Sequence, residues 1–411
     1  MNDDLEDVLR RTLGHASQRA PHAPSSLSVQ VRAHSLRRRT RVQTLVAAVA
    51  VAVVASGAVV AVRGAGGDPA PLVVNPTQAP SSVTATPSPS REQAFVPPEP
   101  IEKVWPQAVW KIPSKLPGIR KYHPRIFIDD RTLLLETWES FEKADAIYAY
   151  DLDGGRVRKI ADIRTPKGVF ADGYTAGAGR IIWKTIKVVD GGRVTEFWSV
   201  PISGGRPTAV DTAAPVKGGG DRLTVVGDKL AFSVLEGGVF TVPLGGGTVE
   251  PVAGAGRHHI LRWPWVGTPG EYTPNHETSF EDLLNVETGE TSKAVVRPGE
   301  QDVRCGVTTC IGNRSEGPSF HRLRDGSQER DLPGSAFMGL GADRFQTVDM
   351  PRPRDGQYLI DLVTGKSGDL GLPPPDAKGQ SVSVQLGMGD DRLVSYPVKG
   401  EYVIIDLTRI R

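Results

Sequence analysis

Between residues 102 and 411, short apolar runs alternate with glycine-containing turns, and one arrangement of them recurs along the chain. Each unit is a run rich in aromatic and β-branched residues, a turn and a second run, as in IYAYDLDGGRVRKIAD, FWSVPISGGRPTAVDT and VFTVPLGGGTVEPVAG. Short runs of this composition bounded by turn residues predict strands, and the glycine between them predicts a hairpin with positive φ. An all-β fold is therefore expected.

The spacing of the turns indicates how these hairpins assemble. The turn glycines are separated by steps of 50, 41, 43, 37 and 39 residues, and a seventh unit, YVIIDLTRIR, ends the chain; these glycines are Gly155, Gly205, Gly246, Gly289, Gly326 and Gly365. A period near 42 residues is the length of one four-stranded propeller blade. We predict a seven-bladed β-propeller, and the uneven steps leave six or eight blades as alternatives.

A further short apolar run precedes each unit and is predicted to be its neighbouring strand within the same blade. The last unit reaches Arg411 with no room for an outermost strand, whereas KVWPQAVWKIP, which starts at Lys103, has no blade of its own. We therefore predict that this segment completes the final blade and closes the ring; its strand residues would be Val104, Trp105, Val109 and Trp110.

A charge-free apolar run begins at Val42 and ends at Val62, between Arg41 and Arg63. As a helix it would be about 31 Å long, which matches the hydrocarbon core of a bilayer. It is too far from the amino terminus for a signal peptide. Arginines concentrate on its amino-terminal side, so the run is predicted to cross the plasma membrane once, with residues 1–41 cytoplasmic and the propeller outside.

The two segments that flank this run differ in composition. Residues 1–41 are charged and begin with a short amphipathic helical pattern, which a cytoplasmic partner of this tail could bind. Residues 63–101 are rich in proline, serine, threonine and alanine and lack a hydrophobic period, as expected of a disordered stalk. The propeller is then predicted to occupy residues 102–411.

The net charge and the cysteine content limit which ligands and which kinds of site can be expected. The formal net charge of the 411 residues is +2, which gives no electrostatic case for binding nucleic acid. The two cysteines, Cys305 and Cys310, flank a four-residue turn in a domain expected outside the cytoplasm, so a disulfide is predicted. A metal or redox pair is the alternative, but the additional ligands of a four-coordinate zinc site are missing nearby.

One aromatic segment is a candidate binding rim. The stretch HHILRWPWVGTPGEY contains His258, His259, Trp263 and Trp265, and the two tryptophans are expected on one face of a strand. Packing between blades is the alternative role for these tryptophans. Acidic residues that follow, including Glu271, match no calcium-loop pattern and are interpreted as a solvated loop.

The repeats resemble those of TolB-like propellers, in which an aromatic-rich strand runs through aspartate to a paired-glycine turn. The likeness covers about 310 residues, is clearest in the first three units, and lacks the Trp-Asp pair of WD repeats. With its alanine, valine, arginine and proline bias, the whole layout is similar to membrane-anchored propellers of actinobacteria. The resemblance implies a periplasmic or cell-surface scaffold for binding and no reaction.

The sequence contains no G-x-S-x-G, H-E-x-x-H or P-loop motif, and no catalytic residue, metal site or cofactor is predicted. The favoured function is a non-enzymatic binding, scaffold or sensing module for an envelope protein, peptide or glycan. Two alternatives stay open. One is a hydrolase or lyase that uses the central channel, and the other is a transmembrane signalling protein whose tail binds a regulator such as a sigma factor.

Overall fold

The computed structural model describes residues 97–140, 143–166, 168–273, 277–336, 339–350, 356–373, 382–387 and 391–411. Within these ranges no helix has the length and apolar character needed to cross a bilayer. The predicted tail, membrane helix and nearly all of the predicted stalk lie outside the described residues. All described elements belong to one compact unit, residues 97–411.

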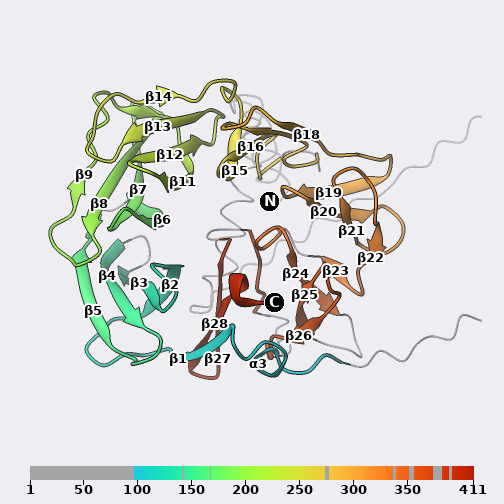
Figure 1. Ribbon diagram of the computed structural model, residues 1–411. Helices are drawn as coiled ribbons and strands as arrows, with labels where there is room; N and C mark the ends of the chain where they lie inside the picture. The colour runs from blue at the N-terminus through green and yellow to red at the C-terminus, as the bar shows by residue number, and fades with distance from the viewer. Residues whose placement is uncertain are drawn as a thin grey trace, which may run out of the picture. The chain divides into compact units, whose positions relative to one another are not determined.

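In the part of the chain that the structure describes, the strands form seven antiparallel sheets that follow one another around a ring (Figure 1). The first three sheets are β2 (Tyr122–Phe127), β3 (Thr132–Ser140), β4 (Lys143–Asp151) and β5 (Val157–Asp162); β6 (Phe170–Gly177), β7 (Arg180–Val189), β8 (Gly192–Pro201), β9 (Thr208–Ala209) and β10 (Val216–Lys217); and β11 (Gly220–Val226), β12 (Lys229–Val234), β13 (Val239–Pro243) and β14 (Glu250–Pro251). The next three are β15 (His259–Arg262), β16 (Trp265–Thr268), β17 (Asp282–Asn285) and β18 (Thr291–Lys293); β19 (Glu300–Cys305), β20 (Thr309–Arg314), β21 (Phe320–Leu323) and β22 (Arg330–Asp331); and β23 (Ser335–Ala336), β24 (Phe345–Met350), β25 (Gly356–Asp361) and β26 (Ser367–Asp369). The seventh is β27 (Leu393–Val398), β28 (Glu401–Asp406) and β1 (Val109–Pro113).

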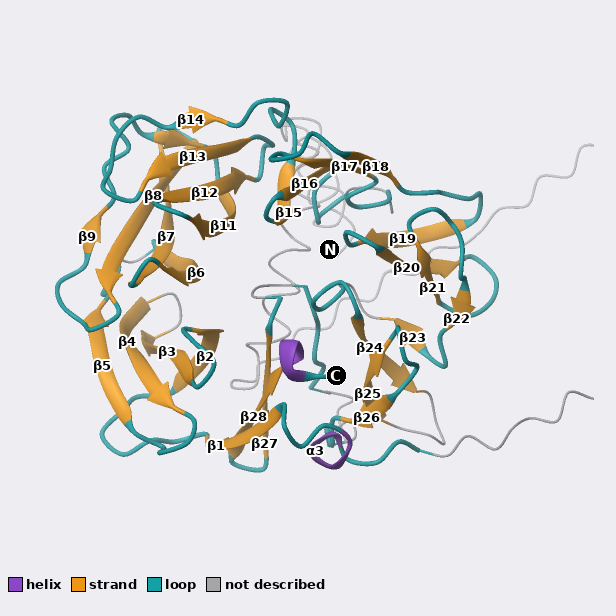
Figure 2. Cartoon of the chain, viewed as in Figure 1, coloured by secondary structure: helices purple, strands orange, loops and turns teal. Residues whose placement is uncertain are grey.

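This arrangement is the all-β, seven-bladed propeller that the repeat spacing predicts. Within each of the first six blades the strands pair in chain order, and the first strand, such as β6 or β11, lies toward the middle of the ring (Figures 1 and 2). The outer position of the second blade is shared by β9 and β10, which both pair with β8. The six predicted turn glycines all have positive φ, from 64° at Gly155 to 144° at Gly205.

The final blade combines strands from the two ends of the described chain. Strand β1 pairs antiparallel with β28, so that Val109 lies opposite Ile405 and Trp110 opposite Ile404. A short 3-10 helix, Leu407–Arg409, follows β28, and the guanidinium of Arg409 stacks 5.2 Å from the Trp110 ring centroid. Because β1 precedes the first blade in sequence, this pairing closes the ring.

Val104 and Trp105 do not belong to the closing strand, so this part of the prediction is wrong. Val104 ends the short helix α3 (Ile101–Val104), and Trp105 follows it with its side chain buried in the core between the sixth and seventh blades. The reason lies in the next residue. Pro106 has no amide hydrogen and disfavours helical geometry at Trp105, so the chain turns there and pairing begins only at Val109.

Hydrophobic cores fill the spaces between neighbouring blades. One contains Ile147 of the first blade and Ile181 of the second, and another joins Ile112 of β1, Leu133 of β3 and Ile404 of β28. All five side chains are at most 1% exposed. Each such burial stabilises the fold by about 1.5–3 kcal/mol, so the cores hold neighbouring blades together.

Candidate functional site: a pocket at the inner strands

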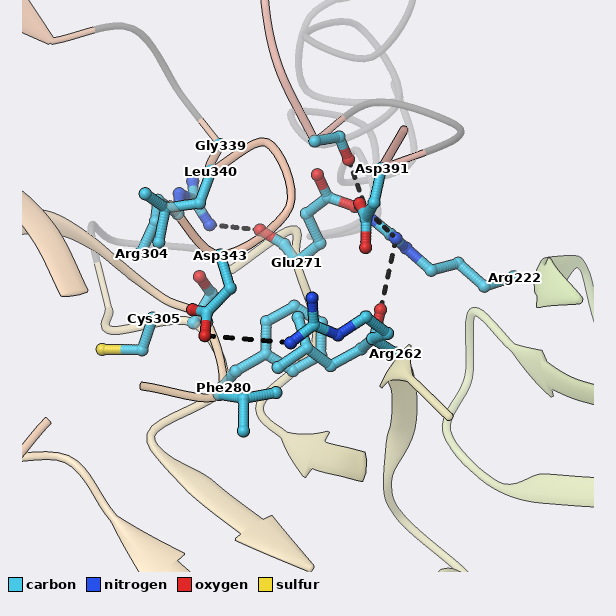
Figure 3. A pocket seen from close by; sticks show the side chains of 15 residues that line it. Arg222, Arg262, Glu271, Phe280, Arg304, Cys305, Gly339, Leu340, Asp343 and Asp391 are labelled. Atoms are coloured by element: carbon cyan, nitrogen blue, oxygen red, sulfur yellow. Dashed lines mark hydrogen bonds and ion pairs between the residues drawn. The ribbon is translucent and has the colours of Figure 1, made fainter. Parts of the chain in front are cut away.

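A small pocket lies where inner strands and turns of the third to seventh blades approach one another (Figure 3). It leaves about 40 Å³ for water-sized groups, and on this measure one water needs roughly 10–15 Å³. Its walls come from β11, from the ends of β15 and β19, from the β16–β17 connection and from the turns before β24 and β27. The charged residues among them are Arg222, Arg262, Glu271, Arg304, Asp343 and Asp391.

Arg222 makes most of the polar contacts in one wall of this pocket. Its guanidinium donates to the Glu271 carboxylate at 3.0 Å, to Asp391 at 3.4 Å and to the carbonyl oxygens of Leu261 at 3.3 Å and Gly387 at 2.6 Å. One side chain of the third blade thereby binds the fourth blade and the segment that leads into β27. Arginine suits this position because its planar group offers several donors in a fixed geometry.

Burial and the neighbouring Arg222 have opposite effects on the pKa of the Glu271 carboxyl. The side chain of Glu271 is only 18% exposed, and this burial raises the pKa of its carboxyl, although Arg222 partly offsets the effect. The main-chain carbonyl of the same residue accepts a hydrogen bond from Arg304. Burial also lowers the pKa of Arg304, which is 9% exposed. The connection between β16 and β17 is thus anchored in the pocket by two arginines from other strands.

A second wall is built around the disulfide turn. Cys305 and Cys310 lie directly opposite each other on β19 and β20 and form a disulfide with an S–S distance of 2.03 Å. Asp343, from the neighbouring blade, accepts hydrogen bonds from the Thr308 amide and hydroxyl and from the Thr309 amide. Burial nevertheless raises the pKa of Asp343. Its carboxylate therefore fixes the turn that lines the pocket.

A separate pair, Asp221 and His259, lies beside Arg222 on the inner strands. His259 Nδ1 is 3.2 Å from the Asp221 carboxylate, which also accepts a hydrogen bond from Ser233 at 3.1 Å. Burial opposes ionisation of Asp221, but the His259 hydrogen bond and the Arg222 charge outweigh it and its pKa is lowered. Ser233 is fully buried and bonds to the aspartate, not to the histidine, so these residues do not form a Ser-His-Asp triad.

The residues of the predicted binding rim are divided between two strands and a turn. His259 begins β15 directly after His258, whereas Trp263 belongs to the turn after β15 and Trp265 begins β16. The expectation that both tryptophans share one strand face is wrong, because the turn at Trp263 and Pro264 reverses the chain between them. Trp263 instead donates to the Glu287 carboxylate at 2.8 Å.

The residues that do converge are not recognisable as a set in the sequence. Nothing in the local pattern singles out Arg222, and the pattern around Glu271 indicates a solvated loop, although the two side chains form the central ion pair. They are 49 residues apart, and Arg222 and Asp391 are 169 apart. No local motif encodes such pairs. The strand that carries Arg222, β11 (GDRLTVV), has a polar first half and lacks the apolar pattern by which the middle strands are recognised.

Comparisons with known proteins show no family for this chain. No family of known proteins and no curated protein sequence matches the chain. Solved propellers do match. YCF48 bound to D1 peptide is 9% identical over 76% of this chain and 99% of its own, with a TM-score of 0.45. The propeller domain of the Trilobed protease from Pyrococcus furiosus is 14% identical over 74% and 94%, with a TM-score of 0.40.

Enzymes also occur among these structural neighbours. Acylaminoacyl peptidase in complex with Z-Gly-Gly-Phe-chloromethyl ketone is 14% identical over 68% of this chain and 49% of its own, with a TM-score of 0.42. Oligogalacturonate lyase in complex with manganese is 10% identical over 74% and 92%, with a TM-score of 0.31. Similarity at this level shows the fold alone, because propellers serve many unrelated functions.

Proposed function

We propose that this protein is a non-enzymatic binding module, a propeller that a single membrane helix tethers outside the cytoplasm and that presents its pocket face to an envelope partner. The observation that carries the proposal is the state of the ionisable groups at the pocket. Most of them already have partners: Arg222 is paired with Glu271 and Asp391, and Asp343 accepts hydrogen bonds from the disulfide turn. Side chains bound in this way fix the shape of the surface around the pocket.

The size of the pocket supports the same conclusion. About 40 Å³ accommodates a few waters or one small functional group, whereas pockets that enclose whole small molecules have volumes of roughly 300–1,000 Å³. Neither the triad geometry of a serine hydrolase nor a group of three metal-ligating side chains is found among the described residues. A partner would therefore insert one group into the pocket and keep the rest of its contact surface outside.

Two features support the proposed location. The apolar run from Val42 to Val62 has the length of a membrane span, and the arginines before it favour a cytoplasmic amino terminus. The disulfide between Cys305 and Cys310 is the cysteine state that oxidising compartments favour. The ordered unit would then be carried by the proline-rich stalk on the outer side of the membrane.

The location can be tested by thiol labelling of intact cells that produce the full chain. Both native cysteines are bridged, so a cysteine introduced as Val188→Cys, at a side chain that is 72% exposed, would be the single reactive thiol. We expect a membrane-impermeant maleimide to label this variant without lysis. The matched control, Ser17→Cys in the amino-terminal tail, should be labelled only after lysis. Labelling of Val188→Cys only after lysis would place the propeller inside and refute the proposed location.

A further inference from the structure

Two hydrogen-bond donors with spare capacity line the same pocket. Ser279, in the connection that leads to β17, is 1% exposed, and its hydroxyl has no hydrogen-bond partner among the described residues. Arg262, at the end of β15, keeps 47% of its side chain exposed and makes one long ion-pair contact, 3.9 Å from Asp343. No hydrogen bond from its guanidinium occurs in the described part of the chain. A buried hydroxyl without a partner costs about 1–3 kcal/mol, so a ligand atom that reached Ser279 from the adjacent pocket would relieve this cost.

The acids around these donors are already occupied. Asp343 accepts three hydrogen bonds from Thr308 and Thr309, and Glu271 and Asp391 are ion-paired with Arg222. Arg304 adds a buried positive charge to the pocket wall beside Ser279, because an isolated parallel β-bridge joins these two residues. The lining contains three arginines and three carboxylates, but the arginine with unused donors lies at the rim, where Figure 3 shows it directed toward Asp343.

We propose that the pocket binds a carboxylate group, held by Arg262 at the rim and by the Ser279 hydroxyl within. A guanidinium can only donate hydrogen bonds, so the ligand group must be an acceptor, and a planar carboxylate offers two oxygens for it. The free volume of about 40 Å³ is the size of such a group and excludes the body of its carrier. The inference rests on the proposed binding function and specifies the partner chemistry, a terminal or side-chain carboxylate of a peptide.

The test uses saturation-transfer NMR on the full chain in detergent micelles, with N-acetyl-diglycine as probe and its carboxamide as the uncharged counterpart. We expect saturable transfer to the acid and none to the amide. Arg262→Gln and Ser279→Ala should each weaken binding by about tenfold or more, which corresponds to roughly 1.4 kcal/mol. Arg206→Gln, at an exposed arginine outside the pocket, is the matched control and should bind as the native chain does.

A second measurement separates a ligand-binding role of Ser279 from a structural one. A hydroxyl that bonds only to a ligand makes no hydrogen bond in the ligand-free protein. Ser279→Ala should therefore unfold at the same temperature as the native chain or higher. A lower midpoint together with unchanged probe affinity would overturn the assignment of Ser279, and equal transfer to acid and amide would overturn the carboxylate site. Failure of the proposed location would instead show in the thiol-labelling result, which does not depend on this probe. Glutarate and N-acetyl-aspartate amide, tested in parallel, would distinguish free acids from peptide side chains as sources.

Discussion

Replacement of Arg222 by methionine should loosen the contact between the third blade, the fourth blade and the segment before β27. Methionine fills much of the volume but donates no hydrogen bond, so Glu271 and Asp391 lose their shared cation. Removing one partner of a buried ion pair costs about 3–5 kcal/mol. The side chains of Arg222, Glu271 and Asp391 retain 19%, 18% and 27% exposure, so solvent screening reduces the expected loss to about 2–3 kcal/mol.

The loss should depend on pH, and its sign is set by Glu271. Burial raises the pKa of this carboxyl and Arg222 lowers it, so the pKa in the methionine variant should be higher still. A carboxyl whose pKa is raised by folding binds more protons in the native state, so stability increases as pH falls toward its unfolded pKa. The difference in unfolding free energy between the native chain and Arg222→Met should therefore shrink from pH 7.5 to pH 5.

The assay is urea unfolding of the full chain in detergent, followed by tryptophan fluorescence at both pH values. Arg206→Met, at an exposed arginine, is the matched control and should change the unfolding free energy by less than about 0.5 kcal/mol. The double variant Arg222→Met/Glu271→Gln should recover part of the loss, because its uncharged amide needs no cation. A loss below about 0.5 kcal/mol, or one of equal size at both pH values, would refute the reasoning.

Three further perturbations test other parts of the fold. The double change Cys305→Ser/Cys310→Ser opens a short loop and should lower the unfolding free energy by about 2 kcal/mol, with far-UV circular dichroism unchanged. Ile112→Ala in β1 should cost about 2–5 kcal/mol in urea unfolding, whereas Lys111→Ala on the exposed side of the same strand should cost much less; equal losses would contradict a ring-closing role for the buried face. Hydrogen bonds from arginines, of which the one from Arg314 has the largest effect, lower the pKa of Glu329 to about 2. The stability advantage of the native chain over Glu329→Gln should accordingly be full above about pH 5 and vanish as acid titration approaches pH 2.

The blade repeat was predictable because the middle strands of each blade are buried on both faces. Strands such as β3 and β12 are apolar runs, and the turn after each hairpin needs positive φ, which glycine supplies. The innermost strands are different. Segments such as β11 and β19 line the middle of the ring, carry charged residues, and lack the apolar pattern that marks a strand.

The candidate site could not be read from the sequence for the same reason. Its charged groups are contributed by inner strands and turns of different blades, so their proximity depends on closure of the ring and not on spacing. The aromatic segment from His258 to Trp265 stands out locally, yet a turn divides it between two strands. Ser279 could not be singled out at all, because a hydroxyl becomes unusual only when its burial and its missing partner are known.

The central claim, binding of an envelope partner through the pocket, is tested most directly by cross-linking on intact cells with a membrane-impermeant, amine-reactive reagent. The full native chain, Arg262→Gln and Arg206→Gln are compared at equal expression. The account predicts one discrete cross-linked species with the native chain and with Arg206→Gln, and a loss of at least several-fold with Arg262→Gln. No cross-linked species with the native chain would contradict the binding function, and an equal yield from Arg262→Gln would contradict recognition through the pocket.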